Sequence, residues 1–79
     1  MQKSIASAKQ QKFLKLIREI RQQAELRQID VAKRLKQPQS FVSKYESGER
    51  RLDLLELEQV CEACDTDLSD FVQRFQALV

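Results

Sequence analysis

Polar side chains follow one another at helical spacing near the middle of the chain, at Gln39, Ser40, Ser43 and Lys44. The amide of Gln39 can donate and accept at once, so it can pair bidentately with the edge of an adenine in a major groove. Lys44 can reach guanine acceptors or a phosphate, and the two serines are short enough to let a helix approach closely. The alternative is an ordinary solvated helix face, and these residue types alone do not decide between the two.

The surrounding segment, residues 28–47, contains two short helical patterns joined by a break at residues 36–38. We expect the first helix over 28–36 and the second over 38–47, because Pro38 suits the first position of a helix. Gly48 suits the left-handed position that closes one. The apolar positions of the two patterns are Val31, Ala32 and Leu35, then Phe41, Val42 and Tyr45. Two helices with a tight turn, the second polar outside, predict a helix-turn-helix unit for a DNA groove.

Three further helical patterns flank this unit. The first covers residues 7–24, with Ser4 or Ser7 as its cap and inward positions at Phe13, Ile17, Ile20 and Ala24. The second covers residues 53–64, with Leu54, Leu57, Val60, Cys61 and Cys64 inward. The third covers residues 69–78, with Ser69 as its cap. The sequence therefore predicts one all-α domain over residues 1–79, with its core in 13–72.

Composition and charge agree with this class of protein. The chain has 79 residues, 33% of them charged, with one glycine and one proline. That composition favours helices over sheet. Residues 1–51 carry 13 basic and 5 acidic side chains (13 − 5 = +8), whereas residues 52–79 carry 1 and 7 (1 − 7 = −6). The basic part predicts a polyanionic partner, and we expect the acidic part to face away from it.

Several function classes are disfavoured by what the sequence lacks. It has no histidine, no glycine-rich loop and no evident carboxylate cluster, so we expect neither an enzyme nor a cofactor. No apolar run approaches a membrane span and no signal peptide is visible, so a cytoplasmic location is expected. Cys61 and Cys64 spell a CxxC motif, but zinc needs two more ligands. We interpret both as core residues without a metal, although a dimer could pool four thiols.

The segment SxFVSKYExGxRxLDLLEL, together with IREIRQQA and VAKRL, carries a resemblance to a known family. Residues 17–71 resemble the helix-turn-helix domain of the Cro/repressor (XRE) family. The resemblance implies a five-helix, lambda-repressor-like domain that inserts its third helix in the major groove of double-stranded DNA. It also implies a transcriptional regulator acting as a homodimer on a pseudo-palindromic operator.

The resemblance also implies roles for individual residues. Gln28 corresponds to a glutamine that holds a phosphate at the start of the second helix and braces the first glutamine of the third. The base-reading positions are Gln39, Ser40, Ser43 and Lys44, with Ser43 at the edge of the groove. Arg50 and Arg51 lie in a loop that commonly touches the DNA backbone. Phosphate contacts position such a domain, and base contacts give its specificity.

Arg21 and Glu46 correspond to an ion pair between the first helix and the end of the third. The alternative is that both are merely exposed charges. The chain departs from the family where glycine is usual, at Glu25, Lys36 and Asp65, so those connections must accommodate a side chain. The turn before Gln39 also departs from the family pattern.

The C-terminal apolar stripe is wider than packing on one helix requires. Its expected dimer-interface members are Phe71, Phe75, Leu78 and Val79. A self-complementary contact there would set two recognition helices one DNA turn apart. The alternative function is an antitoxin or other protein-interaction module that uses this helix, with or without DNA binding.

Overall fold

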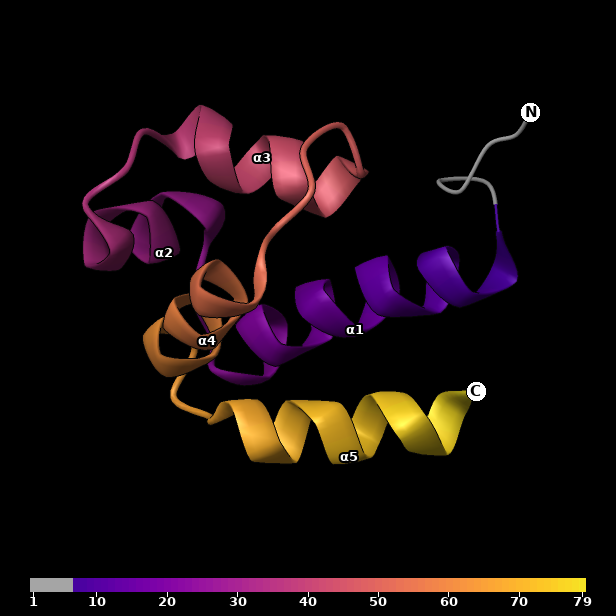
Figure 1. Cartoon of the computed structure of the whole chain (residues 1–79). Coiled ribbons are helices and arrows are strands. Elements are labelled where there is room, and N and C mark those ends of the chain that lie inside the picture. Colours follow the sequence, from indigo (N-terminus) through magenta and orange to yellow (C-terminus); the bar gives the residue numbers. More distant parts are fainter. Residues whose placement is uncertain (1–6) are drawn as a thin grey trace.

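The computed structural model describes residues 7–79, which form five helices (Figure 1). They are α1 (Ala8–Gln23), α2 (Gln28–Leu35), α3 (Gln39–Ser47), α4 (Leu54–Ala63) and α5 (Leu68–Leu78). The predicted all-α, five-helix fold is confirmed. The possible cap Ser4 lies outside the described residues. None of the helices within residues 7–79 is long and apolar enough to cross a membrane.

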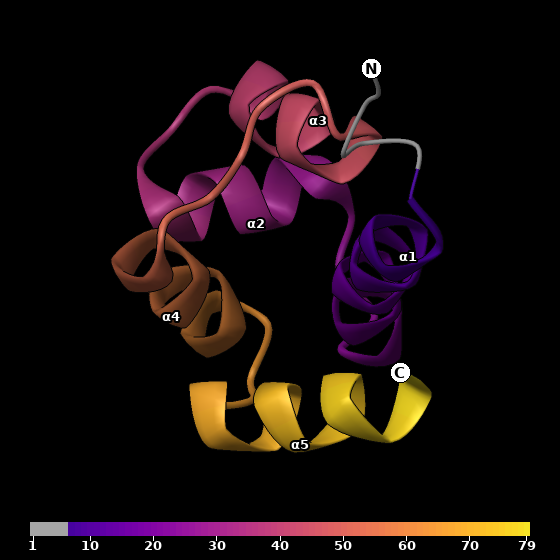
Figure 2. The ribbon, with the colours of Figure 1, turned by 45° about the vertical axis from the view of Figure 1, so that its right-hand side comes forward.

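The helices are arranged so that α3 and α5 lie on opposite sides of the molecule, with α1 and α4 between them (Figures 1 and 2). α3 packs on α2 and α1, whereas α5 packs on α1 and α4. Ala32 of α2 is fully buried where α2 meets its neighbours, and its small side chain permits that close approach. The side of α3 turned away from α1 and α2 remains exposed.

Four of the five helices begin one residue away from the predicted position, and two of them, α1 and α4, start at Ala8 and Leu54. α3 begins at Gln39, and Pro38 precedes it as the N-cap with ψ of 156°, because an extended ψ excludes that residue from the helix. α5 begins at Leu68, capped by Asp67, whose carboxylate accepts from the Asp70 N–H at 2.8 Å. Asp67 is therefore the N-cap in place of the expected Ser69, and its negative charge interacts favourably with the helix N-terminus.

Four residues adopt left-handed backbone conformations at helix ends. Gly48 has φ of 88°, as expected for the end of α3. Glu25, Lys36 and Asp65 have φ of 60°, 58° and 62° despite their side chains. At these three residues the left-handed conformation lets the next backbone N–H donate to a carbonyl of the preceding helix. The Gln37 N–H, for example, donates to the Ala32 carbonyl at 2.9 Å. These are the three positions where glycine was expected and is missing.

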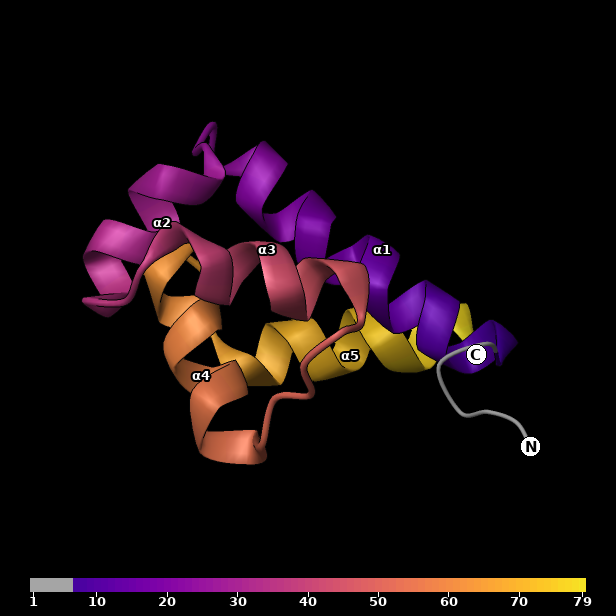
Figure 3. The same ribbon diagram turned by 90° about the horizontal axis from the view of Figure 1, so that it is seen from above.

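The core gathers residues from all the helices. Its buried members are Leu16, Ile17, Ile20, Val31, Ala32, Val42, Tyr45, Val60, Cys61, Ala63, Cys64 and Phe71. Leu14 is also buried, outside this cluster. The prediction that Leu54 faces inward is wrong, because it is 65% exposed. It is the first residue of α4, whose first turn projects beyond α3 at the edge of the molecule (Figure 3).

The left-handed residue Glu25 offers a test of backbone strain. We expect Glu25→Gly to stabilise the fold by about 0.5 kcal/mol, because the left-handed penalty of a residue with a Cβ exceeds the entropic cost of glycine. Glu25→Ala keeps the Cβ and serves as the matched control, with no comparable gain. Urea denaturation measures both, and equal midpoints for the two variants would contradict the strain argument.

Candidate nucleic-acid interface

α3 presents a polar, exposed outer face and a buried inner one. Its outer face consists of Gln39, Ser40, Ser43 and Lys44, all of them exposed. The inner face consists of Val42, Tyr45 and Glu46, each at most 3% exposed. Periodicity alone explains the separation, since positions 39, 40, 43 and 44 lie on one side of a helix of 3.6 residues per turn. The four predicted base-reading residues therefore share one accessible surface.

An ion pair joins this helix to α1. The Arg21 guanidinium donates two hydrogen bonds to the Glu46 carboxylate, from Nε to Oε2 at 2.7 Å and from a second nitrogen to Oε1 at 3.0 Å. The Glu46 side chain is only 3% exposed and that of Arg21 14%. The hydrogen bond to Glu46 raises the pKa of Arg21. Arg18, also on α1, donates to the Glu46 backbone carbonyl at 3.0 Å, so the C-terminal end of α3 is tied down twice.

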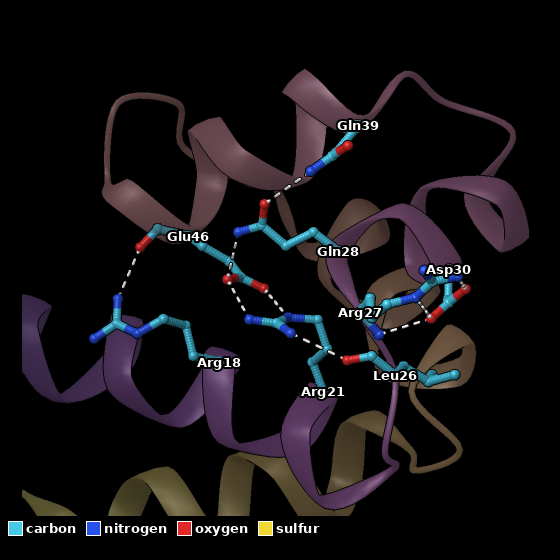
Figure 4. Close-up of polar contacts among 8 residues, drawn as sticks. All are labelled: Arg18, Arg21, Leu26, Arg27, Gln28, Asp30, Gln39 and Glu46. Atoms are coloured by element: carbon cyan, nitrogen blue, oxygen red, sulfur yellow. Dashed lines mark hydrogen bonds and ion pairs between the residues drawn. The ribbon is translucent and has the colours of Figure 1, made fainter.

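A chain of hydrogen bonds runs from this pair to the outer face of α3 (Figure 4). The Gln28 Nε2 donates to Glu46 Oε1 at 3.1 Å. The Gln39 Nε2 in turn donates to Gln28 Oε1, at a longer 3.4 Å. Gln28 stands at the first position of α2 and is half-buried, so it lies between the ion pair and the first residue of α3.

The loop between α3 and α4 is organised around Arg50. Its guanidinium pairs with both Glu56 oxygens, at 3.2 and 2.8 Å, and stacks over the Phe41 ring with 4.7 Å to its centroid. The hydrogen bond from Arg50 is the main cause that lowers the pKa of Glu56. Arg50, expected to contact phosphate, is thus engaged within its own chain. Neither Glu56 nor Phe41 was expected to be its partner.

The start of α2 has Arg27 as its N-cap, and the Arg27 side chain makes no capping hydrogen bond. Asp30 compensates: its carboxylate accepts from the Arg27 backbone N–H at 2.8 Å and from the Arg27 guanidinium. The side-chain hydrogen bond from Arg27 lowers the pKa of Asp30 to about 2. The charges of Arg27 and Asp30 therefore balance each other at the start of α2, next to Gln28.

The remaining candidates are mostly interior. Cys61 and Cys64 are buried free cysteines, and burial raises the pKa of their thiols to about 11 and about 12. Within residues 7–79, no three side chains of metal-binding type cluster together. Phe71 is only 2% exposed and meets Phe13 at 5.8 Å between ring centroids. Phe75 also packs on Phe13, at 6.2 Å.

The fold and this surface define a helix-turn-helix domain, with α2 and α3 as the paired helices. A family model described as helix-turn-helix matches residues 17–71. A solved structure of an "XRE-family like protein" from Pseudomonas syringae pv. tomato str. DC3000 is 39% identical, with a TM-score of 0.86 over 96% of this chain and 93% of that one. A search of curated proteins found no match. The chain belongs to the XRE family of helix-turn-helix proteins, which are DNA-binding regulators.

The Arg21–Glu46 pair offers a test of what holds α3. We expect Arg21→Met to destabilise the fold by about 3 kcal/mol, because it leaves the buried Glu46 carboxylate without its partner. The double variant Arg21→Met/Glu46→Leu should recover most of that loss, since it removes the unpaired charge as well. Urea denaturation gives both values. A double variant as unstable as the single would show that packing, not the charge, is responsible.

Proposed function

We propose that this protein regulates transcription by binding a specific double-stranded DNA sequence with α3 in the major groove. The observation that carries the proposal is the exposed polar face of α3, held from behind by the buried ion pair and the two glutamines. A helix that reads bases must be fixed in orientation, because bidentate hydrogen bonds to base edges require defined geometry. The base contacts are then made by Gln39, Ser40, Ser43 and Lys44. The share of each in the binding free energy depends on the operator sequence.

Positioning on the duplex is assigned to phosphate contacts. Gln28 stands at the N-terminus of α2, where the helix dipole favours an anion. Arg51 is the exposed arginine of the loop after α3. Arg50 contributes mainly by shaping that loop through Glu56 and Phe41. Binding energy of this kind falls steeply as salt rises, because counterions are no longer released as favourably.

Base and phosphate contacts can be told apart by their selectivity. We expect Gln39→Ala to cost about 1–3 kcal/mol at one base pair of the operator and to relax discrimination there. Arg51→Ala should instead weaken binding to all sequences alike and reduce the salt slope by about 1. The operator is first selected from a random duplex pool, and variants are then titrated against its single-base derivatives. Equal, sequence-independent losses for both variants would refute the assignment.

We further propose that two copies of the chain bind together, and that they meet through the start of α4. Leu54 and Leu55 are 65% and 71% exposed, the highest values for large apolar side chains among residues 7–79. Val72 and Leu78 of α5 and the following Val79 are 37–52% exposed, while Phe71 is inside the core. An apolar pair this exposed on the flank of a small domain is suited to burial against a second copy.

The position of α4 favours it over α5 as the contact. Two copies must present both α3 helices to the same side of the DNA, about 34 Å apart. α5 lies opposite α3, so a two-fold contact through its outer face would point the two α3 helices in opposite directions (Figures 1 and 2). The start of α4 lies on the flank between those two sides (Figure 3). A two-fold axis there keeps both recognition helices on one side.

Matched leucine substitutions test the choice of surface. We expect Leu55→Ser to shift the protein toward monomer and to weaken binding to the full operator more than to an isolated half-site. Leu78→Ser, a similar change on α5, should leave association unchanged. Sedimentation equilibrium, with and without operator DNA, measures the oligomeric state. Dissociation caused by Leu78→Ser but not by Leu55→Ser would assign the contact to α5 instead.

A further inference from the structure

The hydrogen-bond chain behind α3 has a direction, and the Glu46 carboxylate sets it. An ionised carboxylate can only accept hydrogen bonds, whereas a glutamine amide has one accepting and one donating end. The end of Gln28 that faces Glu46, 3.1 Å away, must therefore be its NH₂ group. The carbonyl end of Gln28 is then turned toward Gln39, and Gln39 donates to it from its own NH₂ group. Figure 4 shows the three side chains in this order.

This direction determines what Gln39 has left for a base. One N–H of its NH₂ group is used by Gln28, which leaves the second N–H and the carbonyl oxygen Oε1. A donor beside an acceptor matches adenine, whose major-groove edge offers the N7 acceptor and the N6 donor. Guanine offers two acceptors, so Oε1 would face O6 without a hydrogen. A glutamine free to turn its amide would hold this orientation only part of the time, so its preference for adenine would weaken.

We propose that Glu46 is a specificity-determining positioning residue: its charge, relayed through Gln28, fixes the amide orientation of Gln39 so that Gln39 prefers adenine over guanine. Glu46 does this without touching DNA, since it is 3% exposed on the inner face of α3. Arg21 and Arg18 hold Glu46 in place, with Arg21 on the carboxylate and Arg18 on the backbone carbonyl. The inference depends on the proposed base contact by Gln39 and assigns the origin of its selectivity.

The test compares variants that remove the charge with variants that remove only stability. Glu46→Gln keeps the size of the side chain but can donate as well as accept, so the direction of the chain is released. Gln28→Ala breaks the chain at its middle and leaves the ion pair intact, which provides a second variant should Glu46→Gln not fold. Arg21→Lys is the matched control, because it weakens the ion pair while the Glu46 carboxylate still faces Gln28.

The readout is base preference in wild-type protein and variants, titrated against duplexes that differ only at the base pair identified by Gln39→Ala. We expect Glu46→Gln and Gln28→Ala each to reduce the preference for adenine over guanine at that base pair by about tenfold. The base preferences at the other operator positions should not change. The double variant should lose no more than either single one, because both act through one chain. Arg21→Lys should lower thermal stability and keep the preference.

Two failures are distinguishable. If Gln39→Ala changes no single base position, the proposed DNA contact itself is refuted. If Gln39→Ala does so while Glu46→Gln and Gln28→Ala both retain the wild-type preference, the contact stands and the role of Glu46 is overturned. A loss of preference in Arg21→Lys as large as in Glu46→Gln would also overturn it, since general loosening of α3 would then explain the effect.

Discussion

A carboxylate buried between two helices governs the half of this molecule that contains α2 and α3. Glu46 is 3% exposed, and a charge removed from water to that extent must be paired and hydrogen-bonded. Arg21 of α1 and Gln28 of α2 supply those partners. The hydrogen bonds to this one carboxylate of α3 therefore fix three helices relative to one another. Such a pair is weak evidence of net stability, but it admits few alternative arrangements. Orientation, more than stability, is what a base-reading helix requires.

The loop that follows α3 is held by a second charged contact of different character. Arg50 lies over the Phe41 ring and pairs with Glu56, which also completes the cap of α4 with Asp53. The same carboxylate therefore fixes the helix start and the loop conformation. An arginine suits this place because its planar fork can stack and pair at once, which a lysine cannot do. α3 is consequently held both by its buried end and by the loop that leaves it.

The helices and their faces were largely predictable from the chain, whereas contacts between them were predictable only through the family resemblance. The apolar spacing around Val42 and Tyr45 follows from the helical period. Helix starts were less predictable, because Asp67 and Ser69 are both acceptable caps and local sequence does not choose between them. Leu54 shows the opposite limit. Its spacing fits the α4 stripe, but its place in the first turn carries it past the core.

The sequence by itself determined the all-α class, the helix-turn-helix unit and the residues on its polar face, because these depend on periodicity and on the backbone preferences of Pro38 and Gly48. Only the tertiary structure brought Glu46, Gln28 and Gln39 into one hydrogen-bonded chain and turned Arg50 toward its own protein. Such contacts join residues distant in sequence, and they depend on how whole helices cross. The physical reason is that a hydrogen bond requires distance and direction together, which the tertiary packing alone provides.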